Sequence, residues 1–326
     1  MKRAFLLLLV TTICISCMGD GKKVLTSSSG RINDVKVVVP KEYWESTVGD
    51  ALRDVLAVPV DGLPQDEPLF TLSQIEPAVF TGFLKKSRNY VQIEKSDTLD
   101  VRIDRNVNAA PQTAITVSGS TENQIADLIR ERGAEIIAAI REQELSEKQG
   151  RIMKSLKKDD SLERNMGVSL RFPTAYRYAS EDPDFFWMRK DLKSGDMNIT
   201  VYEVPLKTID KDTNTIRNIV RMRDSIGGQN IPVDDGRFIT ERAYTPFLFE
   251  TEIDGHFAYE TKGTWEVDGR FMAGPFLNYA VRDEENNRYV ILEGFIFSPS
   301  VEKRDNVFEI EAILRSARLI DRTQAK

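Results

Sequence analysis

Three short turn signals in the last third of the sequence constrain the fold more than any other feature. They are the Asp-Gly pairs at 254–255 and 268–269 and the Asn pair at 286–287, and each separates two strand-like runs. Such pairs favour the two-residue turns of β-hairpins, because Asn, Asp and Gly accept positive φ angles. Consecutive hairpins place successive strands side by side in antiparallel order. The spacing therefore predicts an antiparallel meander in this part of the chain.

The chain around these turns adds further strands and two helices. The predicted strands are 167–172, 184–192, 197–204, 237–244, 247–253, 256–267, 271–282 and 288–297. Helical spacing predicts one helix from Ile216 to a stop at Gly227-Gly228, and a closing helix over 307–317 that is capped near Ser300. Residues 165–322 are thus predicted as an α+β domain, an antiparallel meander with two helices, rather than a parallel α/β sheet.

The first half of the chain predicts a second, smaller sheet. A β-branched run at 34–39 ends at Pro40, and apolar residues then recur at helical spacing up to Leu56. Three alternating segments follow at 89–94, 99–107 and 112–118. Residues 34–157 are therefore predicted as a β-α-β-β-β-α unit, in which an antiparallel sheet is backed by helices.

A long helical pattern from Thr121 to Leu156 links the two regions. Thr121 and Gln124 form a capping box at its start. Its apolar residues form two sets, and the two sets lie on different sides of the helix. The first set is Ile125, Ile129, Ile136 and Ile140, and the second is Leu145, Ile152 and Leu156. We predict one helix, or two joined near Gly150, that serves two cores, with the charge-dense stretch 154–164 as the boundary.

Composition agrees with two folded domains and limits the partners. The chain has 326 residues, of which 41% are apolar and 29% charged, which excludes a disordered chain. Its formal net charge is −6. Because phosphate binding needs a basic face, no nucleic-acid partner is expected.

The N-terminus has the pattern of an export signal. Lys2 and Arg3 precede an apolar run that is too short to cross a membrane. The segment Cys14-Ile-Ser-Cys17 resembles a bacterial lipobox, which predicts a signal peptide over 1–16, a lipid on Cys17 and a flexible tether over 17–33. The alternative is an ordinary cleaved signal peptide with an incidental cysteine. The lipid predicts an outer-membrane lipoprotein that faces the periplasm, with surface exposure left open.

Three longer segments, together with this start, resemble one particular family. They are the runs 62–70, 86–90 and 293–299. In them the chain is similar to an uncharacterised Bacteroidetes lipoprotein family, catalogued as a domain of unknown function. The element order of the second half also resembles the PsbP and Mog1-like fold. The family resemblance implies a lipid anchor and an envelope location, and it brings no activity and no catalytic residues.

The sequence offers few side chains for catalysis or metal binding. Cleavage before Cys17 discards Cys14, and lipidation consumes the remaining thiol. The one histidine, His256, follows a turn at the start of a strand, a place typical of surface residues. We therefore predict no cofactor, no metal site and no catalytic residue, although 51 acidic residues leave a carboxylate pair open.

Aromatic and basic groups each allow two interpretations. The aromatic run 185–187 and Trp265 would suit a sugar platform, but their alternation in strands favours the core. Arg217, Arg221 and Arg223 give one predicted helix a basic side, which we interpret as a solvated face.

An acidic, proline-rich loop is the candidate partner surface. Its proposed contact residues are Leu63, Pro64, Gln65, Asp66, Glu67 and Pro68. Two prolines stiffen it, which lowers the entropy cost of presenting it to a partner. The alternative is a connector whose Leu69 and Phe70 plug the core. Elsewhere, Thr98 and Ser161 lie in Asp-Ser/Thr-hydrophobic triplets that resemble O-glycosylation sites of secreted Bacteroidetes proteins.

Two functions follow from these observations. The first is a lipid-tethered, non-enzymatic binding or assembly accessory of the cell envelope, whose partner is an envelope protein or glycan. The second is a carboxylate-dependent hydrolase that acts on envelope glycan. An apolar-rimmed surface between the domains would favour the first, and a cleft with two carboxylates, one of raised pKa, would favour the second.

Overall fold

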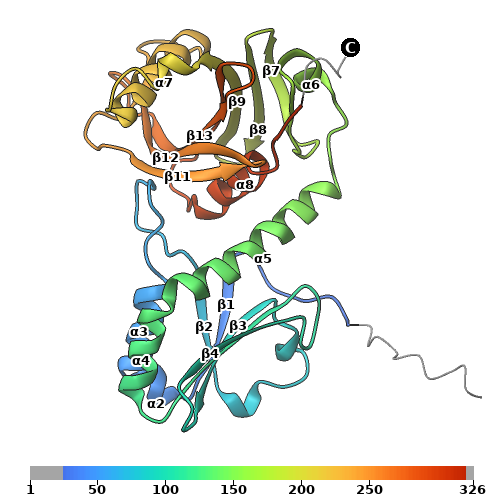
Figure 1. Cartoon of the computed structure of the whole chain (residues 1–326), viewed down its shortest axis with the longest axis vertical. Helices are drawn as coiled ribbons and strands as arrows, with labels where there is room; N and C mark the ends of the chain where they lie inside the picture. The colour runs from blue at the N-terminus through green and yellow to red at the C-terminus, as the bar shows by residue number, and fades with distance from the viewer. Residues whose placement is uncertain (1–24, 321–326) are drawn as a thin grey trace, which may run out of the picture.

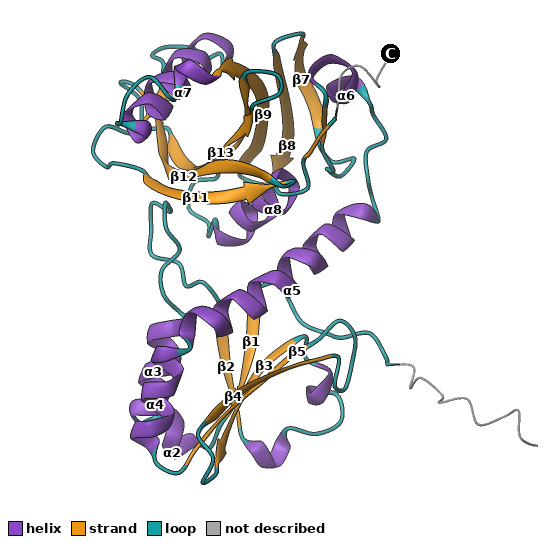
Figure 2. Cartoon of the chain, in the orientation of Figure 1, coloured by secondary structure: helices purple, strands orange, loops and turns teal. Residues whose placement is uncertain are grey.

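The computed structural model describes residues 25–320, which fold into two domains joined by a long helix (Figure 1). Both domains combine helices with a β-sheet, so the predicted α+β class is confirmed (Figure 2). The predicted signal peptide and Cys17 lie outside the described residues.

The first domain contains a five-stranded sheet in the order β2-β1-β3-β5-β4. The strands are β1 (Asp34–Val38), β2 (Thr71–Ile75), β3 (Asn89–Lys95), β4 (Asp100–Arg105) and β5 (Thr113–Gly119). β1 runs parallel to β2 and β3, and β3 runs parallel to β5; only β4 is antiparallel to its neighbour β5. The prediction of an antiparallel sheet is therefore wrong for this domain.

One cause of this error is that β4 lies at the edge, so that β3 pairs with β5 rather than with its neighbour in sequence. Another is β2, which the sequence did not reveal. β2 is an edge strand without a fully buried residue, so it carries no strong apolar alternation. The chain from β1 to β2 crosses over through two helices, α2 (Lys41–Trp44) and α3 (Thr47–Leu56). A crossover of this kind returns the chain in the same direction and makes the paired strands parallel.

Helices cover one face of this sheet and form its core. α3 and α4 (Glu122–Glu131) lie side by side on that face (Figure 2). The core contains Val35, Val37, Leu52, Ile115 and Ile129, all at most 1% exposed. Two 3-10 turns, η1 (Pro77–Val79) and η2 (Leu84–Lys86), lie before β3, and Phe80 between them packs in a smaller cluster with Val38 and Tyr90.

The predicted long helix is two helices. α4 ends at Glu131, and α5 (Gly133–Met153) continues from Gly133, so the break lies at Arg132 and not near Gly150. A Cβ on Gly133 would lie 2.8 Å from Cγ1 of Val55, so the close contact between α5 and α3 requires glycine there. As predicted, Thr121 caps α4, since its Oγ1 accepts a hydrogen bond from Gln124 N.

α5 belongs to both cores, as the switch of its apolar stripe predicts. Ile136 and Ile140 are buried in the first core. Ile152 is buried in the core of the second domain, and Leu145 packs against it. α5 therefore runs from one domain to the other with both ends packed (Figure 1).

The second domain contains an eight-stranded sheet in the order β10-β12-β13-β14-β9-β8-β7, with β11 also paired to β12. Its strands are β7 (Arg177–Asp182), β8 (Phe185–Leu192), β9 (Gly195–Pro205), β10 (Phe238–Thr240), β11 (Phe247–Ile253), β12 (His256–Val267), β13 (Ala273–Asp283) and β14 (Arg288–Phe297). All neighbouring pairs are antiparallel. The predicted meander is confirmed in β11 to β14.

Two helices pack on opposite faces of this sheet. Glu293 of β14 contacts Arg223 on α7 (Thr215–Asn230), whereas the next residue, Gly294, lies against Ile310 on α8 (Arg304–Leu314). Successive strand residues point to opposite faces, so α7 and α8 sandwich the sheet. α7 runs past Gly227 and Gly228 to Asn230, so the predicted stop there is wrong, and α8 is capped at Lys303 rather than near Ser300.

Three further elements complete the second domain. They are α6 (Ser161–Met166), the strand pair β6 (Val168–Ser169) and β15 (Arg318–Leu319), and the 3-10 turn η3 (Leu206–Thr208). Leu162 and Met166 of α6 are buried in the second core. The domain therefore begins before residue 165 and holds one helix more than the two that were predicted.

The segment before β1 is not a free tether within the described residues. Ser27 and Ser29 form β-bridges with Ala110 and Ser87, and Asn33 is buried. The predicted tether over 17–33 is therefore corrected: its residues from Ser27 onward belong to the first domain.

Candidate binding groove between the domains

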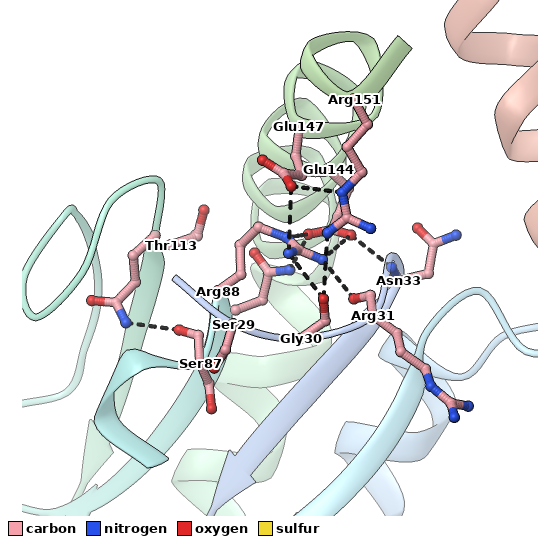
Figure 3. Close-up of polar contacts among 12 residues, drawn as sticks. Ser29, Gly30, Arg31, Asn33, Ser87, Arg88, Thr113, Glu144, Glu147 and Arg151 are labelled. Carbon is pink, nitrogen blue, oxygen red and sulfur yellow. Dashed lines mark hydrogen bonds and ion pairs between the residues drawn. The ribbon is translucent and has the colours of Figure 1, made fainter. Parts of the chain in front are cut away.

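A buried carboxylate on α5 fixes the N-terminal segment to the domain joint (Figure 3). Glu144 is fully buried, and its oxygens accept hydrogen bonds from Arg88 Nε at 2.5 Å, Asn89 Nδ2 at 2.6 Å and Asn33 N at 2.7 Å. The Arg88 guanidinium also donates to the carbonyls of Gly30 and Arg31. Because its partners come from two segments, the residues just before β1 and those at the start of β3, this cluster holds β1, β3 and α5 in one arrangement.

Glu67 of the candidate loop is part of the joint rather than of an exposed surface. Its carboxylate is 6% exposed and accepts hydrogen bonds from Lys303 N at 2.8 Å and from Arg304 N at 2.7 Å. These amides open α8, so a carboxylate of the first domain caps a helix of the second. Glu67 is therefore removed from the predicted partner surface.

The other residues of the loop fit two predicted roles: some belong to a connector that packs in the core, and others to an exposed surface. Phe70 is buried in the first core and Leu69 packs against it, as the connector alternative states. Pro64, Gln65, Asp66 and Pro68 are exposed, and Leu63 is half-buried. The loop rises from the first domain toward β11 and β12 (Figure 1). There Gly62, at φ +80°, approaches β12 so closely that a Cβ would lie 2.8 Å from Gly263 N.

The tip of this loop forms one wall of an apolar pocket between the domains. Leu63 and Pro64 face Tyr244, Pro246 and Phe247 of the second domain around a volume of about 570 Å³. Tyr244 is 72% exposed and Phe247 is 48% exposed. Large aromatic side chains left this open favour association, because covering them removes much apolar surface from water. We call this the apolar pocket.

A second, charged pocket of about 280 Å³ lies where α5, α8 and β12 meet. Arg141, Lys262 and Arg315 line it together with Glu142, Glu260 and Glu311, so its three cations are matched by three carboxylates. We call this the ionic pocket. Its Glu142 lies on the exposed side of α5 and pairs with Arg105 instead.

Glu311 in the ionic pocket and Tyr279 beside it have shifted pKa values that fix their charge states. Burial raises the pKa of Glu311, but the attraction of Arg141 and its hydrogen bonds outweigh this, and the pKa lies below its usual range. Arg141 Nη2 donates to both Glu311 oxygens, at 2.6 and 2.7 Å. Burial raises the pKa of Tyr279 well above its usual value, so its hydroxyl stays protonated and donates to Glu260 Oε1.

Strand β11 connects the two pockets. In the β11–β12 ladder, Phe247 lies opposite Lys262 and Phe249 lies opposite Glu260, so these side chains share one face. The Lys262 ammonium lies 5.1 Å from the ring centre of Phe249. Among the described residues, β11 pairs with β12 only, so its other edge is open. The apolar pocket, β11 and the ionic pocket together form what we call the groove.

The other residues singled out in the sequence lie elsewhere. Thr98 is exposed in the turn between β3 and β4, whereas Ser161 is half-buried at the start of α6. His256 opens β12 opposite Ile253. Over residues 25–320, no group of three potential metal ligands comes together, and no helix is long and apolar enough to cross a membrane.

Arg223 was interpreted as part of a solvated face, and this is wrong. It is 1% exposed and donates to Glu293 at 2.7 and 2.8 Å and to Thr240 Oγ1 at 2.5 Å. Its guanidinium lies 3.6 Å from the ring centre of Phe276. The helical spacing places Arg223 half a turn from Arg217 and Arg221, which are exposed, and this was the available signal.

The chain is thus a two-domain α+β protein with a groove at the domain joint. Comparison with family models gives one match for each domain: residues 28–153 match a domain of unknown function (DUF8532), and residues 155–316 match another (DUF4837). The expected likeness to a domain of unknown function is confirmed, but it is divided between two such domains instead of one family along most of the chain. No curated protein matches the chain.

Solved structures show a weak likeness to the chain. The Ran-binding protein Mog1p of Saccharomyces cerevisiae is 11% identical, with a TM-score of 0.33 over 49% of this chain and 93% of Mog1p. A mutant of protein Mog1 is also 11% identical, with a TM-score of 0.32 over 49% of this chain and 94% of its own.

Proposed function

We propose that this chain is a lipid-anchored binding protein that captures an extended segment of an envelope protein in the groove. The observation that supports this most is the pairing of an open apolar pocket with a pocket lined by three cationic side chains, along the free edge of β11; of the three carboxylates that match these cations, Glu142 is turned to Arg105. A partner segment with an apolar residue beside a carboxylate has the complementary chemistry.

Each part of the groove supplies a different contribution to such binding. Tyr244 and Phe247 offer aromatic anchors of the kind that dominate many interfaces. Lys262 and Arg315 attract a carboxylate. The free edge of β11 offers backbone groups that an extended segment pairs with when it adds as a strand.

The anchor is the second part of the proposal. A lipid on Cys17 would hold the first domain closest to the membrane, because the chain is already bound to that domain at Ser27. The residues from Met18 to Thr26 span at most about 30 Å when fully extended. We expect Cys17→Ala to release the protein from the membrane fraction or to leave an uncleaved precursor. Mass spectrometry that finds an unmodified N-terminus on the membrane-bound protein would contradict the anchor.

The groove is tested with a photo-crosslinking amino acid at position 244 of the full chain in cells. We expect one discrete adduct, which is then identified and purified. A crosslinker at position 83 is the matched control, since Phe83 is 71% exposed but lies in the first domain after η1. Equal labelling at both positions would contradict a specific groove.

Binding of the purified adduct partner then tests the contribution of individual side chains. Phe247→Ser removes an exposed anchor and should weaken binding at least about tenfold, which corresponds to about 1.4 kcal/mol. Lys262→Glu reverses the charge that faces the partner and should weaken binding in a salt-dependent manner. Unchanged affinity in both variants would refute the proposal.

The hydrolase remains the second candidate, because Glu260 and Glu311 line the same pocket. A glycosidase needs one carboxyl group of raised pKa to act as the acid. The pKa of Glu311 is lowered and its oxygens are held by Arg141, so Glu311 does not suit the role of the acid. Multiple turnover of purified envelope glycan that is abolished by Glu260→Gln would support the hydrolase instead.

A further inference from the structure

A second hollow lies on the other face of the large sheet, the face that α7 covers. Trp187, which was expected in the core with its neighbours, is half-buried and lines a pocket of about 130 Å³, whereas Phe185, Phe186 and Trp265 are buried as expected. A larger pocket of about 550 Å³ shares Val233, Met272 and Phe297 with it. The two pockets are adjacent, and together we call them the α7-side hollow.

A chain of polar side chains is fixed beside Trp187. Trp187 Nε1 donates to Asn198 Oδ1 at 2.9 Å, and Asn198 Nδ2 donates to Asp196 Oδ1. Arg189 Nη2 donates to the other Asp196 oxygen at 2.9 Å. The register of β8 with β9 places Arg189 directly opposite Asn198, so the groups share one face of the sheet. Each side chain is therefore oriented by its neighbour before any ligand arrives.

This network keeps unused hydrogen-bonding capacity toward the hollow. Arg189 carries five N–H donors. Its Nε is buried and faces an oxygen of Asp191 at 3.5 Å, and Nη2 donates to Asp196, so the donors left for a ligand are the other N–H groups of the guanidinium that lines the hollow. The carboxylate of Asp196 has further lone pairs. A donor and an acceptor are thus presented side by side at the edge of an indole ring.

We infer that the α7-side hollow binds a sugar ring of a glycan. A sugar has an apolar face of C–H groups, which packs on an aromatic ring, and a rim of hydroxyls that both donate and accept hydrogen bonds. Trp187 provides the ring, while Arg189 donates and Asp196 accepts. The larger pocket, with fully exposed Phe271 at its edge, extends the site for a neighbouring sugar unit.

Charge and pairing at the site favour this ligand class over two others. Asp234 and Asp235 line the larger pocket together with Arg270, which pairs with Asp235, so a phosphate group would meet a net negative charge there. Asp196 is engaged by both Arg189 and Asn198, so it is placed to hold a hydroxyl rather than to transfer a proton. The hollow is therefore a binding site, and it is independent of the groove on the opposite face.

The test is an array of immobilised oligosaccharides that covers hexose, N-acetylhexosamine and uronic-acid chains, probed with the full chain in detergent. We expect retention of at least one class, with an affinity that tryptophan fluorescence titration then measures. Trp187→Ala and Arg189→Gln should each weaken binding at least tenfold. Trp44→Phe, which changes a tryptophan of the first domain, should leave binding unchanged and serves as the matched control.

Three results would overturn the inference: no retention of any glycan class, binding that survives Trp187→Ala, or binding lost equally in the Trp44 control. Circular dichroism tests whether the variants are folded. If Trp187→Ala unfolds, glycan binding is measured with Asp196→Asn instead, which keeps the size of the side chain. Phe247→Ser of the groove should bind glycan as the wild type does. Failure of the sugar site and failure of the groove are thereby distinguishable.

Discussion

Replacing Glu144 with leucine tests whether the buried cluster at the domain joint stabilises the protein. The carboxylate is fully buried and accepts hydrogen bonds from Arg88, Asn89 and Asn33 N. Its removal leaves the buried Arg88 charge with two carbonyl partners and the more distant Glu147 carboxylate at 3.9 Å, and breaking a buried pair in this way costs about 3–5 kcal/mol. Such a loss is a large fraction of the typical stability of a folded domain, which is about 5–15 kcal/mol.

The assay is urea unfolding of the full chain, with hydrogen exchange of the two domains measured separately by mass spectrometry. We expect a loss of about 4 kcal/mol, with faster exchange in β1, β3 and α5 before the second domain is affected. Glu142→Leu is the matched control, because Glu142 lies on the same helix but is exposed and pairs with Arg105 at the surface. That variant should lose no more than about 1 kcal/mol.

The combination of Arg88→Met with Glu144→Leu should recover much of the lost stability, because no unpaired charge then remains buried. A loss below about 1 kcal/mol in Glu144→Leu alone, equal to that of the exposed control, would refute the reasoning.

Acid should loosen the contact between α5 and α8. Burial raises the pKa of Glu309, but Lys148 and Lys190 outweigh this and hold the pKa below its usual range. The stabilisation is therefore present above about pH 4.3, the unfolded value, and is lost as the pH falls through the lower folded value. Melting curves from neutral pH downward should show this loss, and Glu309→Gln should flatten it; an unchanged acid limb would contradict the assignment. In the second domain, Arg223→Met alone should cost about 3–5 kcal/mol in urea unfolding, and adding Glu293→Leu should restore most of it. Equal losses in the single and double variants would show that packing, rather than charge, dominates there.

The structure shows which parts of the candidate sites the sequence could reveal. The loop with Leu63 and Pro64 stood out because its prolines and acids fit no regular element. Phe247 and Lys262 were visible only as residues of predicted strands, and nothing local marks them as neighbours of that loop. Their closeness depends on where β11 and β12 meet the first domain, which is a long-range contact.

Local periodicity and turn chemistry determined the meander of β11 to β14, the closing helix and the two-faced helical stretch that ends in α5. These features follow from interactions between residues close in sequence, so a single sequence carries their signal. Three features were decided only by the tertiary structure: the parallel pairing of β1 with β2, the use of Glu67 as a cap for α8, and the choice of Glu293 as the partner of Arg223. In each case the partner lies far away in the sequence. The local sequence around a strand, a carboxylate or a guanidinium is the same whether that group contacts water or another part of the protein.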